Sequence, residues 1–225
     1  MQVLFKTDYD QDINYLVNRG ERFRILAAVV LALVAPFMVG AYFLSEISIF
    51  LVYILAGLGL MVLIGFTGVV SFGHAAFMGI GAYTNSVLLG YGVPFFVTLP
   101  LAALLAGLIG AALGRAASKM HGFYMAIATL AFAIVIETAI GAWEPVTGGH
   151  MGLSVPPMSA FGWEVSAGRV QYYIILAVVL FCIWGVANLM RSATGRAFVA
   201  VRDSETSARS LGLDIARTRI LAFFI

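Results

Sequence analysis

The chain has 225 residues, of which 62% are apolar and only 11% are charged. A soluble domain carries about twice that share of charged residues, so the composition excludes an ordinary soluble protein. The formal net charge of +2 says little by itself, and we expect no nucleic-acid partner. The single cysteine, Cys182, excludes a disulfide framework and a cysteine-based metal site.

Apolar runs predict an all-α fold, a polytopic transmembrane helix bundle in the lipid bilayer. Each run approaches the roughly 20 residues that a helix needs to cross the hydrocarbon core. A polar cytoplasmic leader, residues 1–24, comes first, and Glu46 predicts a turn after the first span. Pro36 predicts a kink within that span. The expected spans are residues 25–44, 47–64, 72–89, 95–114, 123–142 and 172–189.

The segment between the second and third spans is unusual for a membrane protein. Residues 47–114 contain no Asp, Glu, Lys or Arg, yet their middle is rich in glycine and small polar side chains. Polar groups at membrane depth are costly unless they face protein or a water-filled path. The glycines either break a helix beside a solute or let helices pack closely, and His74 fits a structural contact as well as a solute path. We expect a glycine-broken segment, with substrate-path candidates Gly65, Thr67, Gly68, Ser71, Gly73 and His74.

The fourth span carries small residues at every fourth position. Such a stripe predicts close contact with another helix, because small side chains let two backbones approach. The residues are Ala102, Ala106, Gly110 and Gly114.

The polar segment that follows the sixth span predicts a short capped helix over residues 204–211. Its charges suit the helix dipole, and its ends suit capping positions. From the residues alone, this helix is either a docking element for a cytoplasmic partner or an ordinary polar loop. The pattern consists of Asp203 at the N-cap, Glu205 in the first turn, Arg209 in the last turn, Gly212 after the helix and Asp214 at the cap of the next helix.

Charge distribution predicts the orientation of the six spans. With the N-terminus in the cytoplasm, all but one of the 13 Lys and Arg residues fall on the cytoplasmic side, as the positive-inside rule expects. Arg169 is the exception. Aromatic residues near the span ends fit an interfacial belt, namely Trp143, Trp163, Tyr172 and Tyr173.

Four blocks of the chain resemble the branched-chain amino-acid ABC-transporter permeases. In order, they are GFTGVVSFGHAAFMGIGAYT, FYMAIATLAFAIVIE, WEPVTGGHMGL and GRAFVAVRDSETSARSLGLDIARTRILAF, and they cover most of residues 47–223. The chain looks more like the longer of the two paired permeases of that family. The resemblance implies a permease subunit in a bacterial inner membrane that imports branched-chain or related amino acids. It also implies a second permease subunit, two ATP-binding subunits and an extracytoplasmic substrate-binding protein as partners.

The last block also resembles the EAA-type loop of ABC importers, which docks on the ATP-binding subunits. The resemblance implies that the short helix is a coupling helix, and that ATP is hydrolysed in separate subunits. The chain has no G-x-x-x-x-G-K-[ST] motif, so it cannot bind ATP through a P-loop. We expect no catalytic residue, metal or cofactor. The implied coupling residues are Arg202, Asp203, Glu205, Ser207, Ala208, Arg209 and Gly212.

Two other functions compete with an importer subunit. A stand-alone channel or ion-coupled carrier for a small polar solute, such as an amide or urea-like compound, would need no ATPase. Coupling ions usually require acids within the membrane, where Glu137 alone is available. A membrane scaffold is the third alternative. We also expect residues 25–225 to be an ABC-importer transmembrane domain cut at its C-terminal end, because the apolar run at residues 220–225 is too short to span.

Overall fold

The structure, a computed structural model, describes residues 19–118, 120, 122–155, 159–160, 163–164 and 168–225. Most of these residues form helices, which confirms the predicted helical class. The described part of the chain also contains one short antiparallel strand pair. The elements are α2 (Arg19–Met38), α3 (Ala41–Leu60), the π-helical turn η1 (Met61–Phe66), α4 (His74–Gly90), α5 (Phe95–Ala117), α6 (Phe123–Ala142), α7 (Glu144–Thr147), the 3₁₀ turn η2 (Gly149–Met151), β1 (Ser159–Ala160), β2 (Trp163–Glu164), α8 (Arg169–Arg191), α9 (Ala193–Asp203), α10 (Glu205–Ser210) and α11 (Ile215–Phe224).

Four helical segments of the described chain are long and apolar enough to cross a membrane. They correspond to the expected second, fourth, fifth and sixth spans, and they confirm a polytopic helical bundle. α2 has only a shorter apolar stretch, Phe23–Met38, and α4 has 17 residues, so the count of six spans stays a prediction. The four segments are Ala41–Phe66, Phe95–Ala117, Phe123–Ala142 and Arg169–Arg191.

The boundary after the first expected span was predicted wrongly. α2 ends at Met38 and α3 begins at Ala41, so the expected turn at Glu46 lies inside α3. The break lies at Gly40, whose backbone is extended, with φ −70° and ψ 165°. Glu46 needs no turn, since it is exposed on the surface of α3 near the beginning of the helix. Residues 1–18 of the expected leader lie outside the described residues.

Pro36 lies inside α2, as expected, and its effect extends to α8. Proline has no backbone N–H, so the carbonyl of Ala32 loses its usual helical partner. The hydroxyl of Tyr172 donates to that carbonyl at 2.7 Å, and the hydroxyl of Tyr173 donates to the Leu33 carbonyl at 2.9 Å. Tyr172 is completely buried. It therefore ties α8 to α2, and its expected place in an interfacial belt was wrong.

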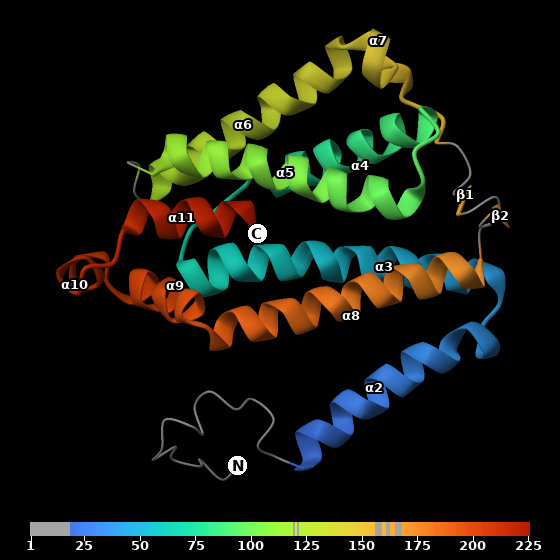
Figure 1. Cartoon of the computed structure of the whole chain (residues 1–225), viewed down its shortest axis with the longest axis horizontal. Helices are drawn as coiled ribbons and strands as arrows, with labels where there is room; N and C mark the ends of the chain where they lie inside the picture. Colours follow the sequence, from blue (N-terminus) through green and yellow to red (C-terminus); the bar gives the residue numbers. More distant parts are fainter. Residues whose placement is uncertain (1–18, 119, 121, 156–158, 161–162, 165–167) are drawn as a thin grey trace.

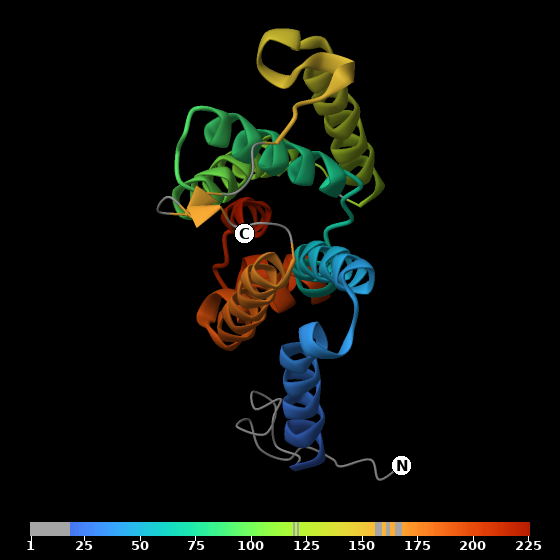
Figure 2. The ribbon, with the colours of Figure 1, turned by 90° about the vertical axis from the view of Figure 1, so that its right-hand side faces the viewer.

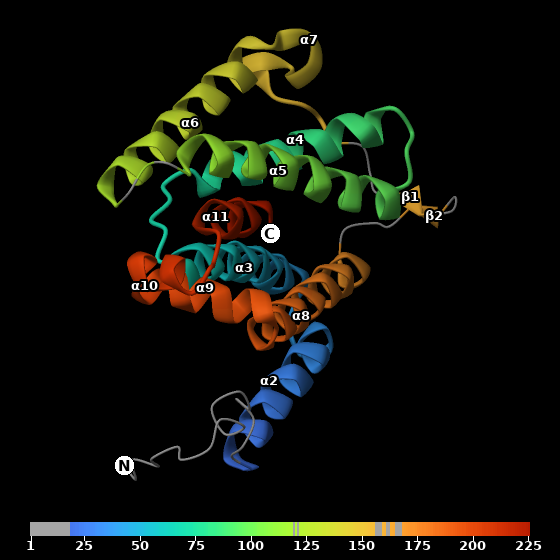
Figure 3. The same cartoon turned by 60° about the vertical axis from the view of Figure 1, so that its left-hand side comes forward.

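The helices form two groups that meet along α11. α3 and α8 lie side by side, with α2 next to α8, whereas α4, α5 and α6 form the other group (Figure 1). α11 packs along α5 and lies between the groups (Figure 3). In a perpendicular view, α2 lies in the lower part of the molecule and α7, at the end of α6, lies at the top (Figure 2). Successive long helices run in opposite directions, as alternating membrane spans require.

Small residues on α5 permit its close contact with α11. A Cβ atom on Gly110 would overlap the carbonyl oxygen of Phe223, and one on Gly114 would lie 3.1 Å from the Cα atom of Ile220. The predicted stripe thus marks a real helix contact at these two positions. Gly107, outside the stripe, meets the carbonyl oxygen of Phe224 in the same way.

Replacing Gly110 with Ala should destabilise the protein. The new methyl group meets backbone of α11, which cannot move aside as a flexible side chain can, so we expect a loss of about 1–3 kcal/mol. Thermal unfolding in detergent measures it. Gly81→Ala in α4 is the matched control, because nothing lies within 4 Å of its Cβ position. Equal melting temperatures for the two variants would contradict this account of the α5–α11 contact.

Candidate functional site

The segment between η1 and α4, in which residues 68–73 are non-helical, is the expected glycine-broken segment. Gly68 turns the chain with a left-handed φ of +69°, which favours glycine. Three backbone donors of the segment have partners within the protein. The N–H of Val69 donates to the Leu63 carbonyl at 3.0 Å, and that of Phe72 to the Thr129 hydroxyl at 3.0 Å. The N–H of Gly73 donates to the Ser71 hydroxyl at 3.3 Å.

The polar side chains of the break face protein. Thr67 and Ser71 are only 3% and 4% exposed, and the Thr67 hydroxyl donates to the Leu63 carbonyl. A Cβ atom on Gly73 would lie 2.8 Å from the Thr129 carbonyl oxygen. Gly68 therefore breaks the helix and Gly73 packs closely, while contact of this segment with a solute stays a prediction.

His74 is the first residue of α4, and its ring lies in the seam between α3 and α4. A Cβ atom on Gly59 would be 2.7 Å from its Cε1 atom. The Nδ1 atom of His74 is buried and has no hydrogen-bond partner within the described chain. The contact with α3 fits the structural interpretation, and a place beside a solute path stays a prediction.

α9 packs directly against the break. Phe198 is completely buried in a cluster with Val62, Leu63 and Val69. Arg202 follows one helical turn later on the same face. Its Nη1 atom donates to the carbonyl of Gly65 at 2.8 Å. Gly65 lies in η1 and is one of the six substrate-path candidates. The break therefore lies at the same end of the bundle as α9 and α10 (Figure 1).

The short capped helix forms as α10, Glu205–Ser210, within the predicted residues 204–211. Ser204 caps it, because the Ser204 hydroxyl accepts from the Ser207 N–H at 3.2 Å. The expected cap at Asp203 was wrong. Asp203 instead ends α9, and its carboxylate accepts from Arg202 at 2.9 and 3.0 Å. Ser204 is the residue with the extended backbone that an N-cap needs.

The C-terminal end of α10 follows the prediction. Gly212 has a left-handed φ of +83°, and Asp214 caps α11 by accepting from the Arg217 N–H at 3.1 Å. Ala208 is buried against α9 and α11. Ser207 and Arg209 are exposed. The α10 region therefore has one face fixed to the protein and one face free to meet a partner.

Arg219 of α11 holds α10 in place, and sequence reasoning missed it. Its guanidinium is only 3% exposed and forms an ion pair with Glu205. It also donates to the carbonyls of Ser118 and Met120, at 2.9 and 3.0 Å. These contacts join three separate stretches of chain. No spacing in the sequence indicates them, because the partners are far apart along the chain.

Two surface depressions lie away from the six path candidates. One borders α10 and is lined by Ser118, Arg209, Leu213, Asp214, Ile215, Ala216 and Arg219. The other lies at the opposite end of the bundle, between α3 and α8, and its polar side chains are Ser45, Ser48 and Gln171. The described part of the chain holds no group of three His, Cys, Asp or Glu side chains that could bind a metal ion.

Comparisons with known proteins identify the relatives of this chain. Residues 42–225 match the family described as the permease component of branched-chain amino acid transport systems. The chain is 33% identical to the high-affinity branched-chain amino acid transport system permease protein LivM of Escherichia coli and 32% identical to that of Salmonella typhimurium. Each match covers 89% of this chain and 53% of the relative. The chain thus spans about half the length of these curated relatives.

A more distant relative has a similar name. A probable branched-chain amino acid transport permease protein LivM of Methanocaldococcus jannaschii is 25% identical over 60% of this chain and 39% of its own. No solved structure matches.

Removing the carboxylate of Glu205 should destabilise the α10 region. Glu205→Ala leaves the buried Arg219 guanidinium without its counter-charge, and we expect a loss of about 2 kcal/mol because Glu205 itself is partly exposed. Thermal unfolding in detergent measures it. Arg217→Ala is the control, since its ion pair with Asp214 is exposed and worth about 0–1 kcal/mol. An equal loss in both variants would refute the special role of the Arg219–Glu205 pair.

Proposed function

Because the chain belongs to the family of permease components of branched-chain amino acid transport systems, we propose that it acts in an ATP-driven importer. It would form the membrane-spanning permease subunit that carries branched-chain or related amino acids. The family match carries this proposal, and the four membrane-length helices agree with it. Transport would occur by alternating access, with ATP hydrolysed in partner subunits.

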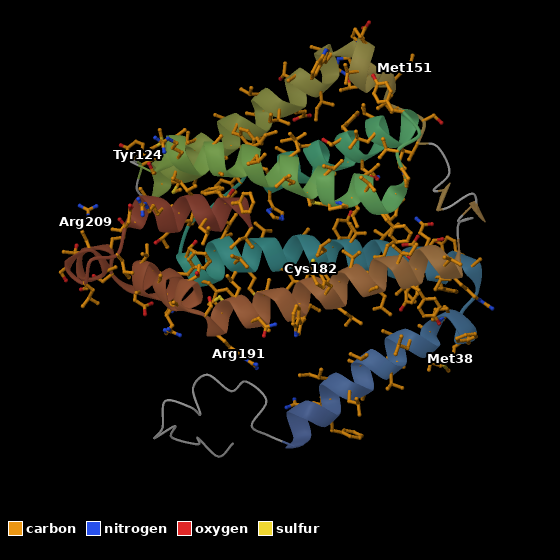
Figure 4. The ribbon with its side chains drawn as sticks, in the orientation of Figure 1. Met38, Tyr124, Met151, Cys182, Arg191 and Arg209 are labelled. Atoms are coloured by element: carbon orange, nitrogen blue, oxygen red, sulfur yellow. The ribbon has the colours of Figure 1, made fainter. Side chains whose placement is uncertain are left out.

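α10 is the proposed coupling helix for an ATP-binding subunit. Ser207 and Arg209 are among its exposed residues, and Arg209 lies at one end of the bundle (Figure 4). The Ser204 cap, buried Ala208 and the Arg219–Glu205 pair make its position well defined. A docking element needs such rigidity, because a partner's movement must shift the whole helix rather than bend it. The complete importer would contain two ATP-binding subunits, a second permease subunit and an extracytoplasmic substrate-binding protein.

The solute route would run beside the glycine-broken segment. An unwound backbone at membrane depth is the usual means by which transporters offer polar groups to a zwitterionic solute. The candidates remain Gly65, Thr67, Gly68, Ser71, Gly73 and His74. His74 is the most informative of them, because its buried Nδ1 atom has no partner in the described chain.

We place the protein in a bacterial inner membrane with its N-terminus in the cytoplasm. The positive-inside count supports this orientation. It puts α10 in the cytoplasm and the connection between α6 and α8 outside. Met151 in that connection and Arg209 after it lie at opposite ends of the molecule (Figure 4).

An ion-coupled carrier is less well supported. It would require acids along the membrane helices, and Glu137 lies on an exposed face of α6 rather than in a polar cluster. Family membership favours the importer. The two functions differ in a measurable way, since only the importer needs ATP.

Thiol labelling tests the orientation. In a Cys182→Ala background, a cysteine replacing Met151 should react with an impermeant reagent added to intact cells, because Met151 is 98% exposed. A cysteine replacing Leu211, which is 78% exposed, should react only after the membrane is opened. The reverse pattern would overturn the proposed orientation.

Changes at the end of α10 test the coupling role. Gly212→Val should strain the left-handed turn by about 1 kcal/mol or more, and Arg209→Glu should place negative charge at the negative end of the helix. In the assembled importer, both substitutions should lower substrate-stimulated ATP hydrolysis and substrate uptake. The affinity of the binding protein for free substrate should stay unchanged.

Gly92→Val is the matched control for this experiment. Gly92 has a similar φ of +80° but lies in the turn between α4 and α5, at the opposite end of the bundle. The Gly92→Val substitution should impose similar strain on its own turn without affecting ATP hydrolysis. Wild-type hydrolysis and uptake in both α10 variants would mean that α10 is an ordinary connector.

A further inference from the structure

We infer that Arg202 is the positioning residue that transmits movement of α10 to the break between α3 and α4. The inference rests on the proposed coupling function and deepens it, because it names the contact that joins the ATP-dependent side to the membrane segment. Arg202 stands at the point where α9 ends and α10 begins, separated from α10 only by Asp203 and Ser204.

The guanidinium of Arg202 bonds to η1 and to Asp203, the last residue of α9. Its Nη1 atom donates to the Gly65 carbonyl in η1 at 2.8 Å. Its Nε and Nη2 atoms donate to the Asp203 carboxylate at 3.0 and 2.9 Å. The planar fork of arginine presents separate donors to the two acceptors, whereas lysine has only a compact ammonium on a flexible stem. One side chain thus connects the start of the coupling region to the end of α3.

The stem of Arg202 makes a second contact with the break. A Cβ atom on Gly68 would lie only 2.9 Å from the Cγ atom of Arg202, so the methylene groups rest on the glycine backbone. Phe198, one turn earlier, is buried among residues of η1 and the break. The exposed ion pair with Asp203 contributes little stability. The link therefore depends on the bond to Gly65 and on this packing.

η1 is the element whose change of state the inference requires. Its turn is π-helical, and its last bond runs from the N–H of Thr67 to the carbonyl of Val62, five residues back. An α-helix bonds four residues back, so conversion of η1 to α would rotate the following chain by about 100°. The segment that would rotate contacts α6 through Phe72 and α3 through His74. Arg202 holds η1 from outside through the Gly65 carbonyl, so movement of α9 and α10 would bias that change.

The experiment uses the complete importer, with this protein assembled with its partner subunits in proteoliposomes. Uptake and ATP hydrolysis are measured on the same samples for Arg202→Ala, Arg202→Lys and Arg196→Ala. Arg196 is the matched control, because it is an exposed arginine of the same helix whose Nη1 atom donates to the Arg191 carbonyl of α8. Arg202→Ala should assemble and hydrolyse ATP while its uptake per ATP falls about tenfold, the effect of losing one charged hydrogen bond.

Arg202→Lys should give an intermediate ratio of uptake to hydrolysis, and Arg196→Ala the wild-type ratio. An unchanged ratio in Arg202→Ala would overturn the inference. A fall of uptake and hydrolysis in equal proportion would also overturn it, since it would indicate a purely structural role. Failure of the proposed function is distinguishable, because the wild-type assembly would then show no ATP-dependent uptake.

Discussion

An unwound chain inside a membrane protein must find partners for its backbone within the protein, and this constraint shapes the region around the break. Between η1 and α4 the chain leaves the helix, so its backbone donors need partners from other parts of the protein. The Thr129 hydroxyl of α6 and the Ser71 hydroxyl take two of these donors. Arg202 bonds the Gly65 carbonyl from α9. The break therefore depends on two other helices, so neither can move without affecting it.

Two arginines of the C-terminal region perform different tasks. Arg219 is fully buried and bonds a carboxylate and two backbone carbonyls, so it fixes α10 to α11 and to the turn after α5. Arg202 is partly exposed and has one long-range bond, to Gly65. A buried charge with several bonds is costly to disrupt, whereas an exposed one exchanges its partners easily. The first suits a rigid support and the second suits a joint that changes state.

The sequence predicts what depends on local pattern. The positions of four spans, the contact of α5 through Gly110 and Gly114, and the left-handed turn at Gly212 follow from periodicity, small side chains and glycine chemistry. Local pattern failed where two residues offer the same chemistry. Asp203 and Ser204 both suit an N-cap, and only the backbone conformation selects Ser204. Arg219 and Tyr172 act across long chain distances, which no spacing in one sequence reveals.

The pairing of Tyr172 with Ala32 shows how a local defect becomes a tertiary contact. Pro36 frees a carbonyl within the apolar part of α2, and a free carbonyl there is unfavourable unless a donor reaches it. Tyr172 supplies that donor from α8 while burying its ring against α3 and α2. A similar contact forms at the other end of the bundle, where η1 ends before Gly68. There the side chain of Arg202, from α9, donates to the Gly65 carbonyl and packs on the backbone of Gly68. In both places an interruption of one helix creates a bond to a second, which makes each interruption a site where two helices are joined rather than a weak point of the fold.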